Sequence, residues 1–148
     1  IGKIKDKYIR DGISEFSKRL SRYANLNIIE LAEEDDNKGI GTAITKETER
    51  IIDALNKRNR SYSILLDLKG KLKSSEEMAE EIENISLQYS EINFIIGGSN
   101  GVDDELRKLV DFRLAFSSFT FPHQLMRLIL MEQIYRWISI TKNIKYHK

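Results

Sequence analysis

The sequence predicts an α/β fold with a mostly parallel sheet flanked by helices. Three observations predict it. Short apolar runs at residues 62–68 and 92–96 are typical of buried strands, and the second suits a central parallel strand. Longer segments between such runs repeat their apolar residues at helical spacing. The 148 residues, 41% hydrophobic and 32% charged, predict one globular domain spanning residues 1–148.

The first half of the chain supplies four of the expected elements. Residues 6–23 predict an amphipathic helix, 26–31 a strand, and 32–41 an acidic, glycine-bearing surface loop. Thr42 can cap the next helix, whose apolar face includes Ile44, Ile51 and Leu55. Residues 62–68 predict a buried strand, and we expect Gly70 to end it.

The second half continues the alternation. Ser74 and Glu77 fit a capping box at the start of a helix. The strand at 92–96 is followed by a glycine-rich turn at 97–101, a short helix that begins near Asp103 and reaches Val110, and a strand at 112–116. A polar and aromatic loop at 117–121 leads to Pro122, the only proline, in the first turn of a helix over 123–141.

That last helix carries apolar residues on more than one face. A helix of this kind is usually buried on both sides. Because it ends a small domain, we expect a partner subunit to cover its second face.

Composition excludes several classes of site. Without cysteine the chain has no disulfide, no thiolate metal site and no cysteine nucleophile, and it suits a reducing compartment such as the cytoplasm. With only His123 and His147, we expect no protein-built zinc site. No apolar run approaches the roughly 20 residues that span a bilayer. The net charge of +1 neither supports nor excludes a nucleic acid, so local clusters matter more. Four basic clusters stand out, at residues 3–10, 18–22, 57–60 and 142–148.

Four segments could carry chemistry. The turn at 97–101 lets backbone approach a ligand, although Asp103 and Asp104 after it would repel phosphate; a plain capped turn is the alternative. The loop before Pro122 could read an adenine edge, or its aromatics could simply fill the core. Glu132 and Arg136, at i,i+4, either pair with each other or present the guanidinium to a phosphate. The terminal Tyr146 and His147 would matter only if the tail folds over a site.

Taken together, these segments resemble the 23S ribosomal RNA pseudouridine N3-methyltransferase family of the SPOUT superfamily. The matching stretches run in the family's order along essentially the whole chain. They are Gly2-Lys3, the stretch 66–76 (LDLKGKLKSSE), the stretch 94–101 (FIIGGSNG), Phe121-Pro122-His123-Gln124 with Arg127, Glu132-Gln133 with Tyr135-Arg136, and Tyr146-His147-Lys148. The family's first strand lies just before Gly2, so we expect this strand to be incomplete here.

The resemblance implies a C-terminal trefoil knot that holds S-adenosylmethionine, an exception to the un-knotted norm. The positions that it carries over to the methyl donor are Leu66, Gly97, Phe116, Ser117, Ser118, Phe119, Thr120 and Phe121. It also implies a homodimer that acts on 23S ribosomal RNA in the assembled ribosome, with a site completed by the partner.

For the reaction, Tyr146 and His147 are the candidates for substrate contact or proton handling, with His123 as the runner-up. Arg127, Arg136 and Lys148 are the candidates for RNA contacts. Three other readings stay open: a SPOUT enzyme acting on another RNA such as tRNA, a non-catalytic dimeric RNA- or ribosome-binding module, and a generic doubly wound nucleotide binder that prefers ATP or NAD.

Overall fold

The protein is an α/β domain, as expected from the alternating pattern. The structure, a computed structural model, describes residues 1–148 with every side chain except that of Lys38. In chain order its elements are α1 (Lys7–Leu20), the 3-10 turn η1 (Asp36–Lys38), α2 (Ile40–Asn56), β1 (Ser61–Leu72), α3 (Ser75–Ser86), β2 (Glu91–Ile95), α4 (Asp104–Leu109), β3 (Phe112–Ala115) and α5 (His123–Thr141). The three strands are parallel in the order β2–β1–β3, so β1 is central and the prediction that residues 92–96 form a central strand was wrong. The trefoil knot stays a prediction.

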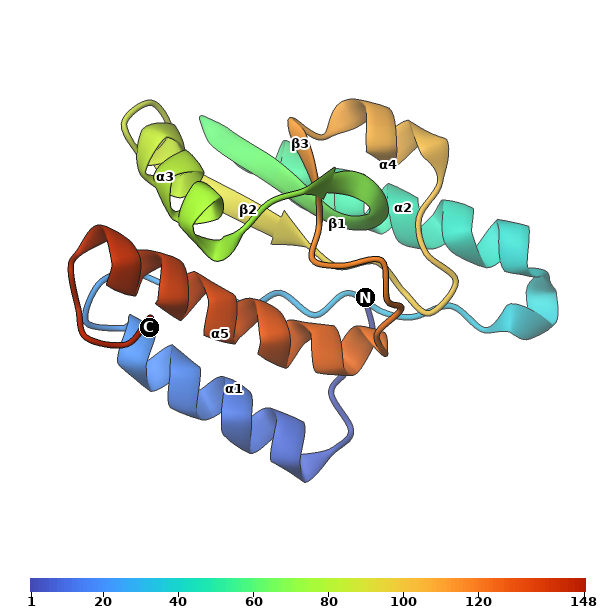
Figure 1. The fold of residues 1–148 in the computed structure, drawn as a ribbon. Helices are drawn as coiled ribbons and strands as arrows, with labels where there is room; N and C mark the ends of the chain where they lie inside the picture. Colours follow the sequence, from blue (N-terminus) through green and yellow to red (C-terminus); the bar gives the residue numbers. More distant parts are fainter.

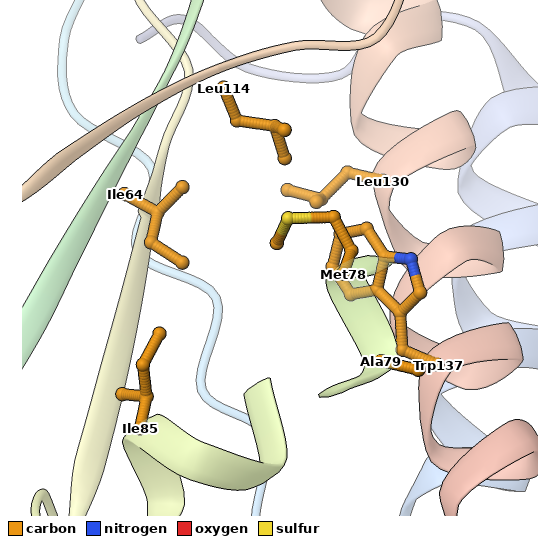
Figure 2. Packing of buried hydrophobic residues seen from close by; sticks show 7 residues of the cluster. All are labelled: Ile64, Met78, Ala79, Ile85, Leu114, Leu130 and Trp137. Carbon is orange, nitrogen blue, oxygen red and sulfur yellow. The ribbon is translucent and has the colours of Figure 1, made fainter. Parts of the chain in front are cut away.

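The sheet separates two layers of helices (Figure 1). On one face, Ile64 and Leu114 of the sheet meet Met78 of α3 and Leu130 and Trp137 of α5 (Figure 2). On the other face, side chains of β1 and β2 pack against α2 and α4. Burying a side chain of this size contributes about 1.5–3 kcal/mol relative to leaving it exposed, so the two clusters fix the layers on the sheet.

The second apolar face of α5 is covered by α1. Ile9, Ile13 and Leu20 of α1 form a buried cluster with Met131 of α5. Helix α5 therefore lies between the sheet layer and α1 (Figure 1). The expectation that a partner subunit would cover this face was wrong, because the chain covers it itself.

Residues 26–31 form no strand, although their composition predicts one. Among the described residues, one backbone hydrogen bond joins this segment to a neighbour, from Gly2 N to Leu31 O at 2.8 Å. Leu26 and Leu31 pack into the core clusters from an irregular backbone, so the apolar pattern reports burial rather than a ladder.

Helix boundaries follow local backbone preferences. The predicted capping box at Ser74 and Glu77 is confirmed, and Asp103 caps α4 as expected. Helix α2 begins at Ile40, directly after Gly39 with φ +96°, so Thr42 lies inside the helix rather than at its cap. Pro122 is the residue before α5 rather than in its first turn.

Gly70 does not end β1, contrary to expectation. Leu66 and Lys71 both pair with Leu114 of β3, so residues 67–70 loop out of the ladder. We call residues 67–70 the β1 bulge. A Cβ at Gly70 would lie 2.8 Å from the carbonyl carbon and oxygen of Arg113, closer than real Cβ contacts. Glycine is needed here because the bulge returns directly against the backbone of β3.

Candidate functional site

One pocket collects the three segments expected to bind the methyl donor. It has a volume of about 760 Å³ and lies where β1, β2 and β3 end, because parallel strands bring their carboxyl ends to one edge of the sheet. Of the positions predicted from sequence, Leu66, Gly97, Phe116, Ser117, Phe119, Thr120 and Phe121 line it. Ser118 is not among the lining residues. The loop before α5 therefore belongs to a pocket wall rather than only to the core.

The turn at 97–101 has a backbone that only glycine fits comfortably. A Cβ at Gly97 would lie 2.7 Å from Val102 Cγ1 and 3.2 Å from the carbonyl oxygen of Gly101. Gly101 has φ +84°, and its N–H donates to Gly98 O at 3.1 Å. The turn thus offers bare backbone to the pocket.

Helix α2 supports this turn from behind. The Glu47 carboxylate is buried and accepts the N–H of Glu34 at 2.9 Å, and a Cβ at Gly98 would overlap its Oε2. The hydroxyl of buried Thr48 accepts the N–H of Asp103 at 3.4 Å. Sequence reasoning missed both residues. A signal existed, since positions 47 and 48 lie on the same helical face as Ile44 and Ile51.

A nearly buried carboxylate ties the β1 bulge to its surroundings. The Asp67 side chain, only 7% exposed, accepts Arg107 Nε at 3.1 Å and the N–H of Lys69 at 3.0 Å. Arg113 of β3 lies 3.6 Å from the same carboxylate. Arg107 also lines the pocket and binds Asp104 at 2.8 Å. The Asp67–Arg107 pair thereby joins two walls of the pocket, the bulge and α4.

His123 adds a polar atom to the pocket wall. Its Nε2 is buried and has no hydrogen-bond partner among the described residues. Burial lowers the pKa of the imidazole, an effect that the Glu33 carboxylate opposes, so the ring is neutral near pH 7. A neutral imidazole with one free nitrogen can bond to a polar ligand atom in the pocket.

The tail folds back along α5 through a helix-ending motif. Asn143 adopts φ +52°, while Ile144 N donates to Ser139 O at 2.8 Å and Asn143 N to Ile140 O at 3.2 Å. This is the Schellman arrangement, in which asparagine can replace the usual glycine. The motif aims the last residues back toward the side chains of the helix.

Four side chains then form what we call the tail cluster: Glu132, Arg136, Tyr146 and His147. Tyr146 OH donates to Glu132 Oε1 at 3.0 Å, which also accepts Arg136 Nε at 3.0 Å. The His147 ring contacts Arg136 Nη1 at 3.2 Å and, on its other nitrogen, Glu76 of α3 at 2.8 Å. Burial, and then the bond to Glu132, raise the pKa of Tyr146, so its phenol stays protonated and acts as a donor.

A single chain does not bring the tail cluster to the pocket. His123 lines the pocket at the start of α5, whereas Arg136 lies thirteen residues further along the same helix. At about 1.5 Å per residue the two are roughly 20 Å apart along the axis. The candidates for proton handling and for donor binding therefore occupy opposite ends of α5.

Arg127 is placed inside the protein. The side chain is buried and donates to the carbonyl oxygens of Ile1 and Gly2, to the latter at 2.8 Å. It also lies 3.6 Å from Glu30. These contacts tie α5 to the start of the chain, which argues against a role for Arg127 in RNA contact. Lys148, in contrast, is exposed.

Two further searches concern membranes and metals. Over the part of the chain that is described, no helix is long and apolar enough to cross a bilayer. The described side chains also include no group of three or more histidine and carboxylate residues arranged to hold a metal ion.

The fold and the pocket define an α/β domain that binds a ligand at the carboxyl edge of its parallel strands. The family model described as "Predicted SPOUT methyltransferase" matches residues 1–147, and the chain belongs to that family. It is thus a methyltransferase, and the pocket has a methyl donor to hold.

Curated relatives cover the whole of this chain and 96% of their own length. The chain is 58% identical to the "Ribosomal RNA large subunit methyltransferase H" of Fusobacterium nucleatum over 149 residues. It is 47% identical to proteins of the same name from Alkaliphilus oremlandii and Finegoldia magna. Membership of the SPOUT family removes the generic ATP or NAD binder as a reading.

Proposed function

We propose that the chain methylates N3 of a pseudouridine in 23S ribosomal RNA, with S-adenosylmethionine as the donor. The observation that carries the proposal is the convergence of Leu66, Gly97 and Phe121 on one pocket in a SPOUT methyltransferase. The relatives named for large-subunit ribosomal RNA support the substrate. We place the reaction in the cytoplasm, where that RNA is assembled into ribosomes.

The residues of the pocket fit this donor. Its volume of about 760 Å³ lies within the roughly 300–1,000 Å³ typical of small-molecule sites. Leu66, Leu114 and Phe121 offer apolar surface for an adenine ring, and the turn at 97–101 offers backbone donors and acceptors. The buried Nε2 of His123 needs a polar partner that the donor can provide.

The donor, when bound, supplies a methyl group on a sulfonium, which passes to N3 as the S–CH3 bond breaks and the N–CH3 bond forms. The residues of the chain must position the base and remove the N3 proton, because a protonated imide is a poor nucleophile. His147 is the candidate acceptor, since its ring is oriented by Arg136 on one nitrogen and Glu76 on the other. Tyr146 is suited to donate a hydrogen bond to the base. Near-attack geometry supplies much of the rate.

We propose that a homodimer closes the gap between the pocket and the tail cluster. Leu125 and Ile129 form an apolar, half-exposed stripe on α5 that belongs to none of the core clusters. Leu68, Leu72 and Phe119 near the pocket are 56–75% exposed. A second copy packed antiparallel on α5 would cover these side chains and place its own tail at this pocket. Arg136 and Lys148 would then be available to RNA beside the partner's donor site.

Calorimetric titration with S-adenosylmethionine tests the donor, with competition by S-adenosylhomocysteine. Binding that the product analogue displaces supports a catalytic site, whereas no heat and no competition would leave only a non-catalytic RNA-binding role. Mass mapping of RNA from cells lacking the protein tests the substrate. Loss of one methyl group from a 23S pseudouridine is the expected result. A loss confined to tRNA would refute the ribosomal target.

A further inference from the structure

Two of the four basic clusters come together in the folded chain. Lys18, Arg19 and Arg22 lie at the end of α1 and just beyond it. Lys142, Lys145 and Lys148 follow α5 in the tail. Figure 1 shows the carboxyl terminus beside the end of α1. We call these six residues the α1–tail patch.

Stacked aromatic rings hold the two segments together. Phe16 of α1 lies 6.1 Å from Tyr135 of α5, measured between ring centroids, and the guanidinium of Arg19 lies 5.8 Å from the Tyr135 ring. Tyr135 in turn meets Tyr146 of the tail edge-on at 4.8 Å. The tail therefore rests on the same residues as the end of α1, and the patch is a consequence of core packing rather than of a chance approach.

Most charges of the patch are not neutralised by neighbours. Lys18, Arg22, Lys142, Lys145 and Lys148 are exposed, and none forms an ion pair with a described carboxylate. Arg19 alone is paired, with Glu15 at 2.9 Å. The patch is thus a local source of positive potential.

The charge balance shows how concentrated this potential is. The chain has 24 lysines and arginines against 23 aspartates and glutamates. Without the six patch residues, 18 cations face 23 carboxylates, a net charge of −5. A polyanion would be repelled by the average of the remaining surface and attracted here.

We propose that the α1–tail patch binds backbone phosphates of the RNA on either side of the base to be methylated. The inference rests on the proposed function, because it takes the tail cluster as part of the reaction site. Tyr146 and His147 lie at the border of the patch, so a base that they contact has its neighbouring phosphates within reach of these cations. Flexible exposed lysines suit phosphates, which position an RNA without reading its sequence.

The test compares two double variants that remove the same charge. Arg22→Gln/Lys145→Gln weakens the patch at both of its segments. Lys57→Gln/Arg60→Gln removes two exposed cations from the α2–β1 connection and is the matched control. Binding of the full-length chain to ribosomes that lack the modification is measured by co-sedimentation at several salt concentrations, and the KM for the same ribosomes is measured by methyl transfer.

The patch variant should bind ribosomes on the order of tenfold more weakly, and its salt dependence should become shallower by roughly 0.7 log units per lost phosphate contact. Affinity for S-adenosylmethionine should stay unchanged, and the control should match the unaltered protein. Equal losses in the two variants, or none in either, would overturn the inference. So would retained ribosome binding with lost binding to phosphatidylserine vesicles. If the unaltered protein binds ribosomes through the patch but binds no methyl donor, the proposed function fails and the RNA surface stands.

Discussion

Gly70→Ala should destabilise the protein because the β1 bulge leaves no room for a methyl group. The added Cβ would lie 2.8 Å from backbone atoms of Arg113 and Leu114, whereas ordinary contact begins at 3.4 Å. The bulge and β3 would have to separate by the difference, about 0.6 Å, and backbone atoms cannot rotate away as a side chain can. Overpacking of this kind costs about 1–3 kcal/mol. The entropy that alanine removes from the unfolded chain returns about 0.4–1 kcal/mol, so the net loss should be about 1–2 kcal/mol.

Urea denaturation followed by tryptophan fluorescence measures this loss. Trp137 is the single tryptophan and is only 2% exposed, so its emission reports unfolding of the main core. Gly41→Ala is the matched control, because nothing lies within 4 Å of its added Cβ inside α2. The control should gain about 0.4–1 kcal/mol. If Gly70→Ala is as stable as Gly41→Ala, the bulge is not closed against β3 in the way described.

Three other perturbations have expected outcomes. Removing residues 146–148 should abolish methylation of ribosomes while the calorimetric affinity for S-adenosylmethionine changes less than about twofold, since the tail lies roughly 20 Å from its own pocket; equal loss of both would make the tail structural. Arg107→Leu should weaken donor binding about tenfold by freeing the bulge from α4, whereas Lys108→Leu on the same helix should not; equal affinities by titration would discount the pair. His123 has a lowered pKa when folded, so the unfolded chain takes up a proton first and stability should fall as pH drops below about 6.5. Urea midpoints should show a smaller fall in His123→Gln, and identical pH profiles would contradict this.

Local rules predicted the helices and most strands because the relevant interactions are short-range. The capping box at Ser74 and Glu77 and the extent of α5 follow from neighbouring residues. Residues 26–31 failed this approach, since a ladder depends on a partner that lies elsewhere in the chain. Gly70 failed for a related reason, because glycine marks close approach of another backbone as well as the end of a strand.

The candidate site was only partly visible in the sequence. Leu66, Gly97 and the loop before Pro122 could be placed together through the resemblance and through the rule that parallel strands end at one edge. The Asp67–Arg107 pair could not, since 40 residues separate its members and either could have paired elsewhere. Nor did the sequence distinguish Arg127, which is buried against Gly2, from an arginine free for RNA. Burial, not residue type, separates these roles.

Helix α5 explains why the catalytic arrangement requires two chains. Its first turn contributes His123 to the donor pocket, and its last turns hold Arg136 and the folded-back tail. A straight helix keeps these ends roughly 20 Å apart, and no side chain bridges that distance. Bending α5 would expose the cores on both of its faces, which Trp137 and Met131 bury. An antiparallel second copy is the arrangement that joins a pocket to a tail without disturbing either core, and it also brings the α1–tail patch of one copy beside the donor site of the other.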